Sequence, residues 1–159
     1  MKAAVLTVSD SVAEGSRGDA SGDLLQELLE QDGYDVTRRV IADEQAAIAD
    51  ALVELAGDAA IVLTTGGTGV AARDVTPEAT RAVLERDAPG IAEAIRADSI
   101  AKTPHALLSR GVAGVIGSTL VVNLPGSTGG CRDGYRVLRP ALEHAVGLLT
   151  GLTTEHRQT

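Results

Sequence analysis

AAIVLTTGGTG (residues 59–69) and DVTPE (residues 74–78) are the two segments that say most about the fold of this chain. The first seven residues of AAIVLTTGGTG are mostly apolar or β-branched and run directly into glycines. A short run of this kind is typical of a central strand in a parallel sheet, which is buried on both faces. We therefore expect a strand at residues 59–65 whose carboxyl end delivers a glycine loop, the position where open α/β sheets hold their ligands.

The loop after this strand has the composition of an anion-binding loop. Its three glycines let backbone N–H groups approach a phosphate closely. Thr76 followed by Pro77 predicts an N-cap and a first-turn proline, which would place the positive end of a helix dipole beside the loop. Asp74 precedes them, where a carboxylate suits Mg²⁺ rather than the phosphate itself.

The loop fits neither of the two common nucleotide motifs. A P-loop requires G-x-x-x-x-G-K-[ST], and this loop has no lysine. The spacing of its glycines also differs from the dinucleotide fingerprint G-x-G-x-x-G. The simpler alternative is a tight strand-to-helix turn, but the threonines and the acid before a capped helix favour a ligand site.

Composition limits the classes of function. The chain has 159 residues, which suits one domain with a full core, and we expect that domain at residues 1–152 with a frayed tail at 153–159. Its 14 basic and 22 acidic residues give a net charge of −8, which repels a nucleic-acid backbone. With no Phe or Trp and only two Tyr, the chain also lacks aromatic platforms for stacking bases. We expect no nucleic-acid partner.

Cysteine content and hydropathy limit the compartment. Cys131 is the only cysteine, which excludes an intrachain disulfide and a CxxC site; a helix start beside it would lower its pKa, although an inert thiol is the commoner case. No stretch approaches the roughly 20 apolar residues needed to cross a bilayer. We expect a soluble cytoplasmic protein without a membrane partner.

Strand and helix patterns alternate along the chain and predict an α/β fold, with a mostly parallel central sheet between two helical layers. Strands are expected at residues 1–8, 34–41 and 59–65, with a hairpin at 112–124 that turns near Gly117. The first helix is expected after the polar loop that runs through Asp19, with Leu24 and Leu28 on its apolar face and its end at Gly33. Further helices are expected at about 44–57, 76–86 and 90–100, and from Cys131 or Asp133 to Leu149.

Four polar loops follow predicted strands and carry three acids, Asp10, Asp43 and Asp74. Because the carboxyl ends of parallel strands meet at one sheet edge, we expect these acids and two glycine loops in a single cleft. Mg²⁺ prefers one or two carboxylates together with substrate phosphates. The pattern predicts a site for a polyphosphate and magnesium, although Asp43 is about equally well explained as an N-cap.

Several uncharged and basic residues are weaker candidates. Ser99, Ser109 and Asn123 lie near expected helix or strand ends and could orient a polar ring or phosphate, although each alone is more often a cap or turn residue. Arg73 and Arg110 could neutralise phosphate charge, although a solvated surface arginine is the commoner case.

Together these motifs resemble the molybdenum cofactor biosynthesis family that includes the bacterial MogA and MoaB proteins and the G domains of a plant homologue and of gephyrin. The pair TTGGTG and RDVTPEA at this spacing is highly specific. The matching segments span almost the whole chain: TVSD (7–10), DEQ (43–45), TTGGTG (64–69), RDVTPEA (73–79), LSR (108–110) and NLPGS (123–127).

The resemblance implies a three-layer α/β/α domain of the molybdopterin-binding type, a trimer or hexamer that adenylylates molybdopterin with Mg-ATP and releases pyrophosphate. A downstream molybdenum insertase is an implied partner. Asp43 and Asp74 would be the catalytic and metal-binding acids, and Ser99, Ser109 and Asn123 would lie near the pterin and its phosphate. The nucleotide would be bound by Ser9, Asp10, Gly66, Gly67, Thr68, Gly69, Pro125, Gly126 and Ser127.

Two departures from the family pattern affect the details. After Leu-Pro-Gly-Ser many relatives continue with proline and a lysine or asparagine, whereas this chain has Thr-Gly-Gly-Cys-Arg, so Arg132 is a candidate replacement for the lysine. The chain also ends soon after its last expected helix, as in compact MoaB-like members. Two alternatives to the enzyme therefore stay open: a noncatalytic binding module for molybdopterin or nucleotide, and a nucleotide pyrophosphatase of the competence-damage type.

Overall fold

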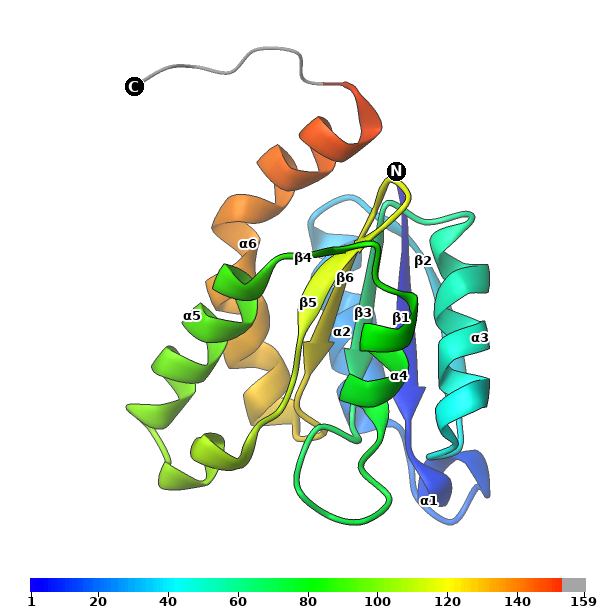
Figure 1. Cartoon of the computed structure of the whole chain (residues 1–159), viewed down its shortest axis with the longest axis vertical. Coiled ribbons are helices and arrows are strands. Elements are labelled where there is room, and N and C mark those ends of the chain that lie inside the picture. The colour runs from blue at the N-terminus through cyan, green and yellow to red at the C-terminus, as the bar shows by residue number, and fades with distance from the viewer. Residues whose placement is uncertain (153–159) are drawn as a thin grey trace.

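Six strands form one sheet between two layers of helices, as the sequence predicted (Figure 1). The computed structural model describes residues 1–152, and the tail predicted at 153–159 lies outside them. The strands are β1 (Lys2–Val8), β2 (Asp35–Ile41), β3 (Ile61–Thr65), β4 (Arg86–Asp87), β5 (Ala113–Ile116) and β6 (Thr119–Leu124). The helices are α1 (Asp10–Ala13), α2 (Ala20–Gln31), α3 (Gln45–Ala56), α4 (Thr76–Val83), α5 (Pro89–Ile100), the 3₁₀ helix η1 (Pro104–Leu108) and α6 (Thr128–Thr150).

The strand order is β2-β1-β3-β6-β5-β4. The first four of these strands are parallel, whereas β5 and β4 run antiparallel to their neighbours. The glycine loops after β3 and β6 therefore leave the sheet at the same edge, side by side, together with the loops after β1 and β2.

The two faces of the sheet bury separate apolar clusters. Along β1, Ala3 and Val5 belong to the cluster that includes side chains of α2, α5 and α6, whereas Ala4, Leu6 and Val8 belong to the cluster that includes side chains of α3 and α4. This alternation follows from the two-residue period of a strand. Burial on both sides explains why β1, β3 and β6 have mostly apolar sequences without a polar residue at every second position.

Two helix boundaries differ from the sequence prediction, and three short elements were absent from it. Helix α4 ends at Val83 rather than near residue 86, because Leu84 turns extended and Arg86–Asp87 pair with β5. Helix α6 begins at Thr128, several residues early, because the Ser127 side chain caps it. The short elements α1, β4 and η1 were not predicted, since two to five residues carry no readable period. Among the described residues no helix is long and apolar enough to cross a membrane.

Candidate ligand site at the carboxyl edge of the sheet

The loops after β1 and β2 are joined through two of the predicted acids. The backbone N–H of Asp10 donates to Oδ2 of Asp43 at 2.9 Å, and the N–H of Asp43 donates to Oδ1 of Asp10 at 3.0 Å. Arg73, from the loop after β3, reaches the same point and pairs with Asp10 and Glu44. Three loops that are distant in sequence therefore meet at one place, as the parallel arrangement predicts.

The first glycine loop requires glycine at its start. Gly66 and Gly67 have φ of 97° and 66°, and a Cβ added at Gly66 would lie 2.2 Å from the carbonyl oxygen of Val8. The Thr76 hydroxyl donates to the Gly66 carbonyl at 2.9 Å, and the Thr76 N–H donates to the Gly67 carbonyl at 3.1 Å. The N-cap predicted at Thr76 is therefore wrong: Val75 occupies the cap, and Thr76 holds the loop.

The second glycine loop lies directly against the first. The Gly66 N–H donates to the Leu124 carbonyl at 3.3 Å, and a Cβ at Gly126 would lie 3.4 Å from the Gly66 Cα. The Ser127 hydroxyl accepts the Gly130 N–H at 3.0 Å and fixes the start of α6. The two glycine loops are therefore in direct backbone contact.

Cys131 lies beneath this junction. Its thiol is fully buried and donates to the Pro125 carbonyl at 3.0 Å and to the Thr65 hydroxyl at 3.3 Å. Burial raises the pKa of this thiol to about 11, opposite to the lowering considered for a helix start. The thiol is therefore a packing group under the loops.

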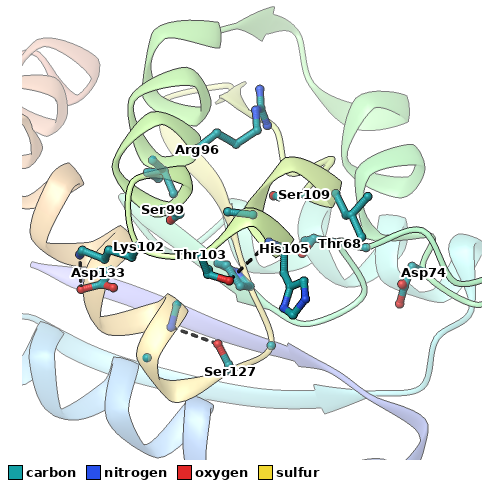
Figure 2. A pocket seen from close by; sticks show the side chains of 18 of the residues that line it. Thr68, Asp74, Arg96, Ser99, Lys102, Thr103, His105, Ser109, Ser127 and Asp133 are labelled. Carbon is teal, nitrogen blue, oxygen red and sulfur yellow. Dashed lines mark hydrogen bonds and ion pairs between the residues drawn. The ribbon is translucent and has the colours of Figure 1, made fainter.

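Two cavities, of about 610 and 410 Å³, adjoin at the glycine loops. Four residues line both: Gly67, Asp74, Gly126 and Ser127. Figure 2 shows the larger cavity, with Asp74 at one end and Lys102 with Asp133 toward the other. Space for two ligands therefore meets at Asp74 and the backbone of both loops.

The larger cavity contains several residues that the sequence predicted. Thr68, Gly69, Ser99, Ser109 and Pro125 line it. Other lining side chains were not predicted, because they come from α5, the turn that follows it, η1 and α6 and belong to no loop motif. These are Arg96, Lys102, Thr103, His105 and Asp133. Lys102 bonds to Asp133 at 2.8 Å and to Asp98 at 2.9 Å, and Arg96 donates to the Gly111 carbonyl at 2.6 Å.

The smaller cavity is more polar. Ser9, Asp43 and Gly66 line it as predicted, whereas Arg17 and Asp19 were missed because they lie in a loop between α1 and α2 without a recognisable motif. Asp10 is not among its lining residues. Its carboxylate instead accepts hydrogen bonds from the Asp43 N–H and from the Arg73 side chain.

Asn123 and Arg132 also line neither cavity. Asn123 is 4% exposed, and its side chain bonds to the Thr64 and Thr80 hydroxyls and to the Val112 N–H. Its expected position beside a substrate is therefore corrected to the interior of the sheet. Arg132 lines a separate small pocket between α2 and α6, so it does not replace a lysine in the second loop.

The two linked carboxylates, Asp10 and Asp43, have opposed environments. The Arg73 guanidinium bonded to Asp10 holds the pKa of Asp10 below its usual value. Burial raises the pKa of Asp43, and the nearby charges of Asp10 and Asp74 act in the same direction. A divalent cation beside Asp43 would therefore stabilise its ionised carboxylate.

The residues present fit a magnesium site shared with a ligand. Within residues 1–152 no group of three or more histidine, cysteine or acidic side chains could hold a metal alone. Asp43 and Asp74 both line the smaller cavity, and a Cβ at Gly67 would lie 3.2 Å from Oδ1 of Asp43. One or two carboxylates beside a bound phosphate are the donor set that Mg²⁺ takes when substrate phosphates complete its shell.

The fold and this site define a class: an α/β ligand-binding domain with two adjoining cavities at the carboxyl edge of its sheet. The family described as "Probable molybdopterin binding domain" matches residues 4–144. The chain belongs to this family, among the MogA and MoaB proteins of molybdenum cofactor biosynthesis.

Relatives and solved structures agree with this assignment. The molybdopterin adenylyltransferase of Helicobacter pylori is 36% identical over 92% of this chain and 86% of its own length. The cinnamon protein of Drosophila melanogaster is 39% identical over 91% of this chain, which spans only 25% of that longer protein. The crystal structure of MoaB from Thermus thermophilus has a TM-score of 0.87 at 44% identity and covers 94% of this chain and 96% of its own.

Proposed function

We propose that this protein adenylylates molybdopterin with Mg-ATP and releases pyrophosphate. One observation carries the proposal: the two cavities meet at Asp74 and at the backbone of both glycine loops. A transfer between two phosphates needs this geometry, in which two ligands occupy separate spaces and their reacting groups adjoin. The name of the H. pylori relative supports the same reaction.

The residues that line the two cavities indicate which substrate each cavity would bind. The larger cavity combines apolar walls such as Ile95 and Leu108 with the hydroxyls of Ser99 and Ser109, which suits a planar heterocycle. The smaller cavity contains Asp43 and the start of the first glycine loop, which suits a polyphosphate with its metal. We assign the pterin to the larger cavity and the nucleotide phosphates to the smaller one.

The proposed step is a single displacement. A terminal phosphate oxygen of molybdopterin forms a bond to the α-phosphorus of ATP, the bond from this phosphorus to the bridging oxygen of the β-phosphate breaks, and pyrophosphate leaves with the electron pair. The attacking phosphate is already ionised at neutral pH, so no general base is required. The backbone of the two loops orients the reacting groups, and Asp43 with Asp74 would hold Mg²⁺, which neutralises phosphate charge when bound.

The test is adenylyl transfer from Mg-ATP to molybdopterin, with adenylylated pterin and pyrophosphate measured together. We expect turnover in the wild type, its loss in Asp43→Asn and Asp74→Asn, and full turnover in the control Asp58→Asn, which changes an exposed acid far from the loops. Pterin binding without product would mean a noncatalytic binding module. AMP formed without pterin would mean a pyrophosphatase. Either result would refute the proposal.

The family resemblance also supports a trimer or hexamer that passes its product to a molybdenum insertase. Light scattering after gel filtration measures the oligomeric state. A monomeric mass at micromolar concentration would contradict the proposed trimer or hexamer.

A further inference from the structure

Arg110 contacts the first glycine loop at several points. It lies between η1 and β5, directly after Ser109, which lines the larger cavity. Its backbone N–H donates to the Thr68 carbonyl at 2.8 Å. Its side chain donates through Nε to the Gly69 carbonyl at 2.7 Å and through Nη2 to the Asp74 carbonyl at 2.7 Å. One residue therefore holds both ends of the segment from Gly69 to Asp74.

The remaining guanidinium nitrogen is also engaged. Nη1 pairs with Glu78 on the first turns of α4, and this pairing lowers the pKa of the Glu78 carboxyl. Arg110 lines neither of the two cavities that meet at the loops. A phosphate would have to displace a carboxylate and two carbonyls to reach it, so Arg110 is poorly placed for the phosphate-neutralising role that its sequence position suggested.

The segment that Arg110 holds determines where the Asp74 carboxylate lies. Oδ2 of Asp74 accepts the Ala71 N–H at 3.0 Å, and the Asp74 N–H donates to the Ala71 carbonyl at 2.9 Å. A Cβ at Gly69 would lie 2.8 Å from the same Oδ2. The carboxylate therefore folds back over its own loop. Apart from these local bonds, the loop is anchored by the contacts of Arg110, by the hydrogen bonds of Thr76 and by the ion pairs of Arg73 with Asp10 and Glu44.

We propose that Arg110 is a positioning residue: its planar guanidinium, fixed by Glu78, holds the segment from Gly69 to Asp74 so that the Asp74 carboxylate faces the junction of the two cavities. The kinetic part of this inference rests on the proposed function. The positioning itself does not, since it can be measured on the free protein. Lysine carries the same charge but cannot span the three acceptors, which makes Arg110→Lys the informative change.

The first measurement is amide hydrogen exchange of wild type, Arg110→Lys and Arg110→Ala. We expect faster exchange in peptides covering residues 66–76 of both variants and unchanged exchange in peptides from α3. Arg139→Lys is the matched control, because it alters an arginine ion pair to Asp32 remote from the loops. If Arg110→Ala does not fold, Arg110→Lys decides alone. Unchanged exchange in residues 66–76 would overturn the proposal.

The second measurement uses metal and turnover. Mn²⁺ titrated in the presence of α,β-methylene-ATP should bind more weakly to Arg110→Lys than to wild type. In adenylyl transfer we expect kcat to fall about 10- to 100-fold, the size of effect that a displaced catalytic group produces, with the KM for molybdopterin unchanged. Faster exchange with unaltered Mn²⁺ affinity and kcat would overturn the role. If the wild type shows no turnover, the proposed function fails, and the exchange and Mn²⁺ data still decide the positioning.

Discussion

Asn123 offers the sharpest test of whether a polar motif residue serves the ligand or the fold. In Asn123→Ala, the protein loses two hydrogen bonds at 3.0 Å to the Thr64 and Thr80 hydroxyls and one at 3.2 Å from the Val112 N–H. Each lost bond leaves a buried group unsatisfied and costs about 1 kcal/mol or more, so the variant should be destabilised by about 3–4 kcal/mol. Thr80 suffers least, because its hydroxyl also donates to the Thr76 carbonyl.

The assay is urea unfolding followed by far-UV circular dichroism, at equal protein concentrations because oligomerisation would shift the midpoint. With a urea slope near 2 kcal/mol/M, the expected loss moves the midpoint by about 1.5–2 M. Gln31→Ala, which trims an exposed helical amide, should change stability by less than about 0.5 kcal/mol. If Asn123→Ala kept the wild-type midpoint while the KM for molybdopterin rose, the structural role assigned to Asn123 would be refuted.

Three further predictions concern the loops and the ion pairs. Gly66→Ala should lower the free energy of unfolding in urea by about 3 kcal/mol or more, because a positive φ and a backbone clash combine there. Gly33→Ala, with a positive φ but open space, should lower it by about 1 kcal/mol. Equal losses of stability in the two variants would contradict this reasoning. The Arg139 ion pair lowers the pKa of Asp32 below 3.8, so the stability it contributes is present above that pH and is lost as pH falls through the folded-state pKa. The melting temperature of Asp32→Asn should therefore lie below that of the wild type at pH 7, and the gap should close in acid; a constant gap would contradict the linkage. Cys131, with its pKa raised to about 11, should react with a disulfide reagent at pH 8 only as fast as the protein opens, and rapid labelling of the native protein would contradict its burial.

The sequence predicted the sheet well because burial on both faces leaves a strong signal. The runs at residues 1–8 and 59–65 are apolar enough to fix two central strands, and the loops after them follow directly. Asp10 and Asp43 met as expected because parallel order alone brings their loops to one edge. Strand β4 was missed because two exposed residues pair only through their neighbour, a tertiary effect that no local pattern records.

The site was less predictable because its side chains come from more than loops. Lys102 and His105 reach the larger cavity from the end of α5 and from η1, where nothing in the local sequence separates them from solvated surface residues. Asn123 was expected near a ligand because it ends a strand beside a glycine loop. The prediction that Asn123 lies near the end of a strand is confirmed. The direction of its side chain, however, depends on the strand's pleat and on the hydroxyls with which it forms hydrogen bonds.

The polar residues of the motifs divide into those that face the cavities and those that build the loops. Asp43 and Asp74 line the smaller cavity, whereas Thr76 and Arg110 donate hydrogen bonds to backbone carbonyls of the first glycine loop. These carbonyls belong to Gly66, Gly69 and Asp74, and their hydrogen bonds from Thr76 and Arg110 fix the path of the loop backbone. A substitution at Thr76 or Arg110 should therefore act on the site through backbone position, and a loss of activity there does not by itself identify a group that touches the substrate.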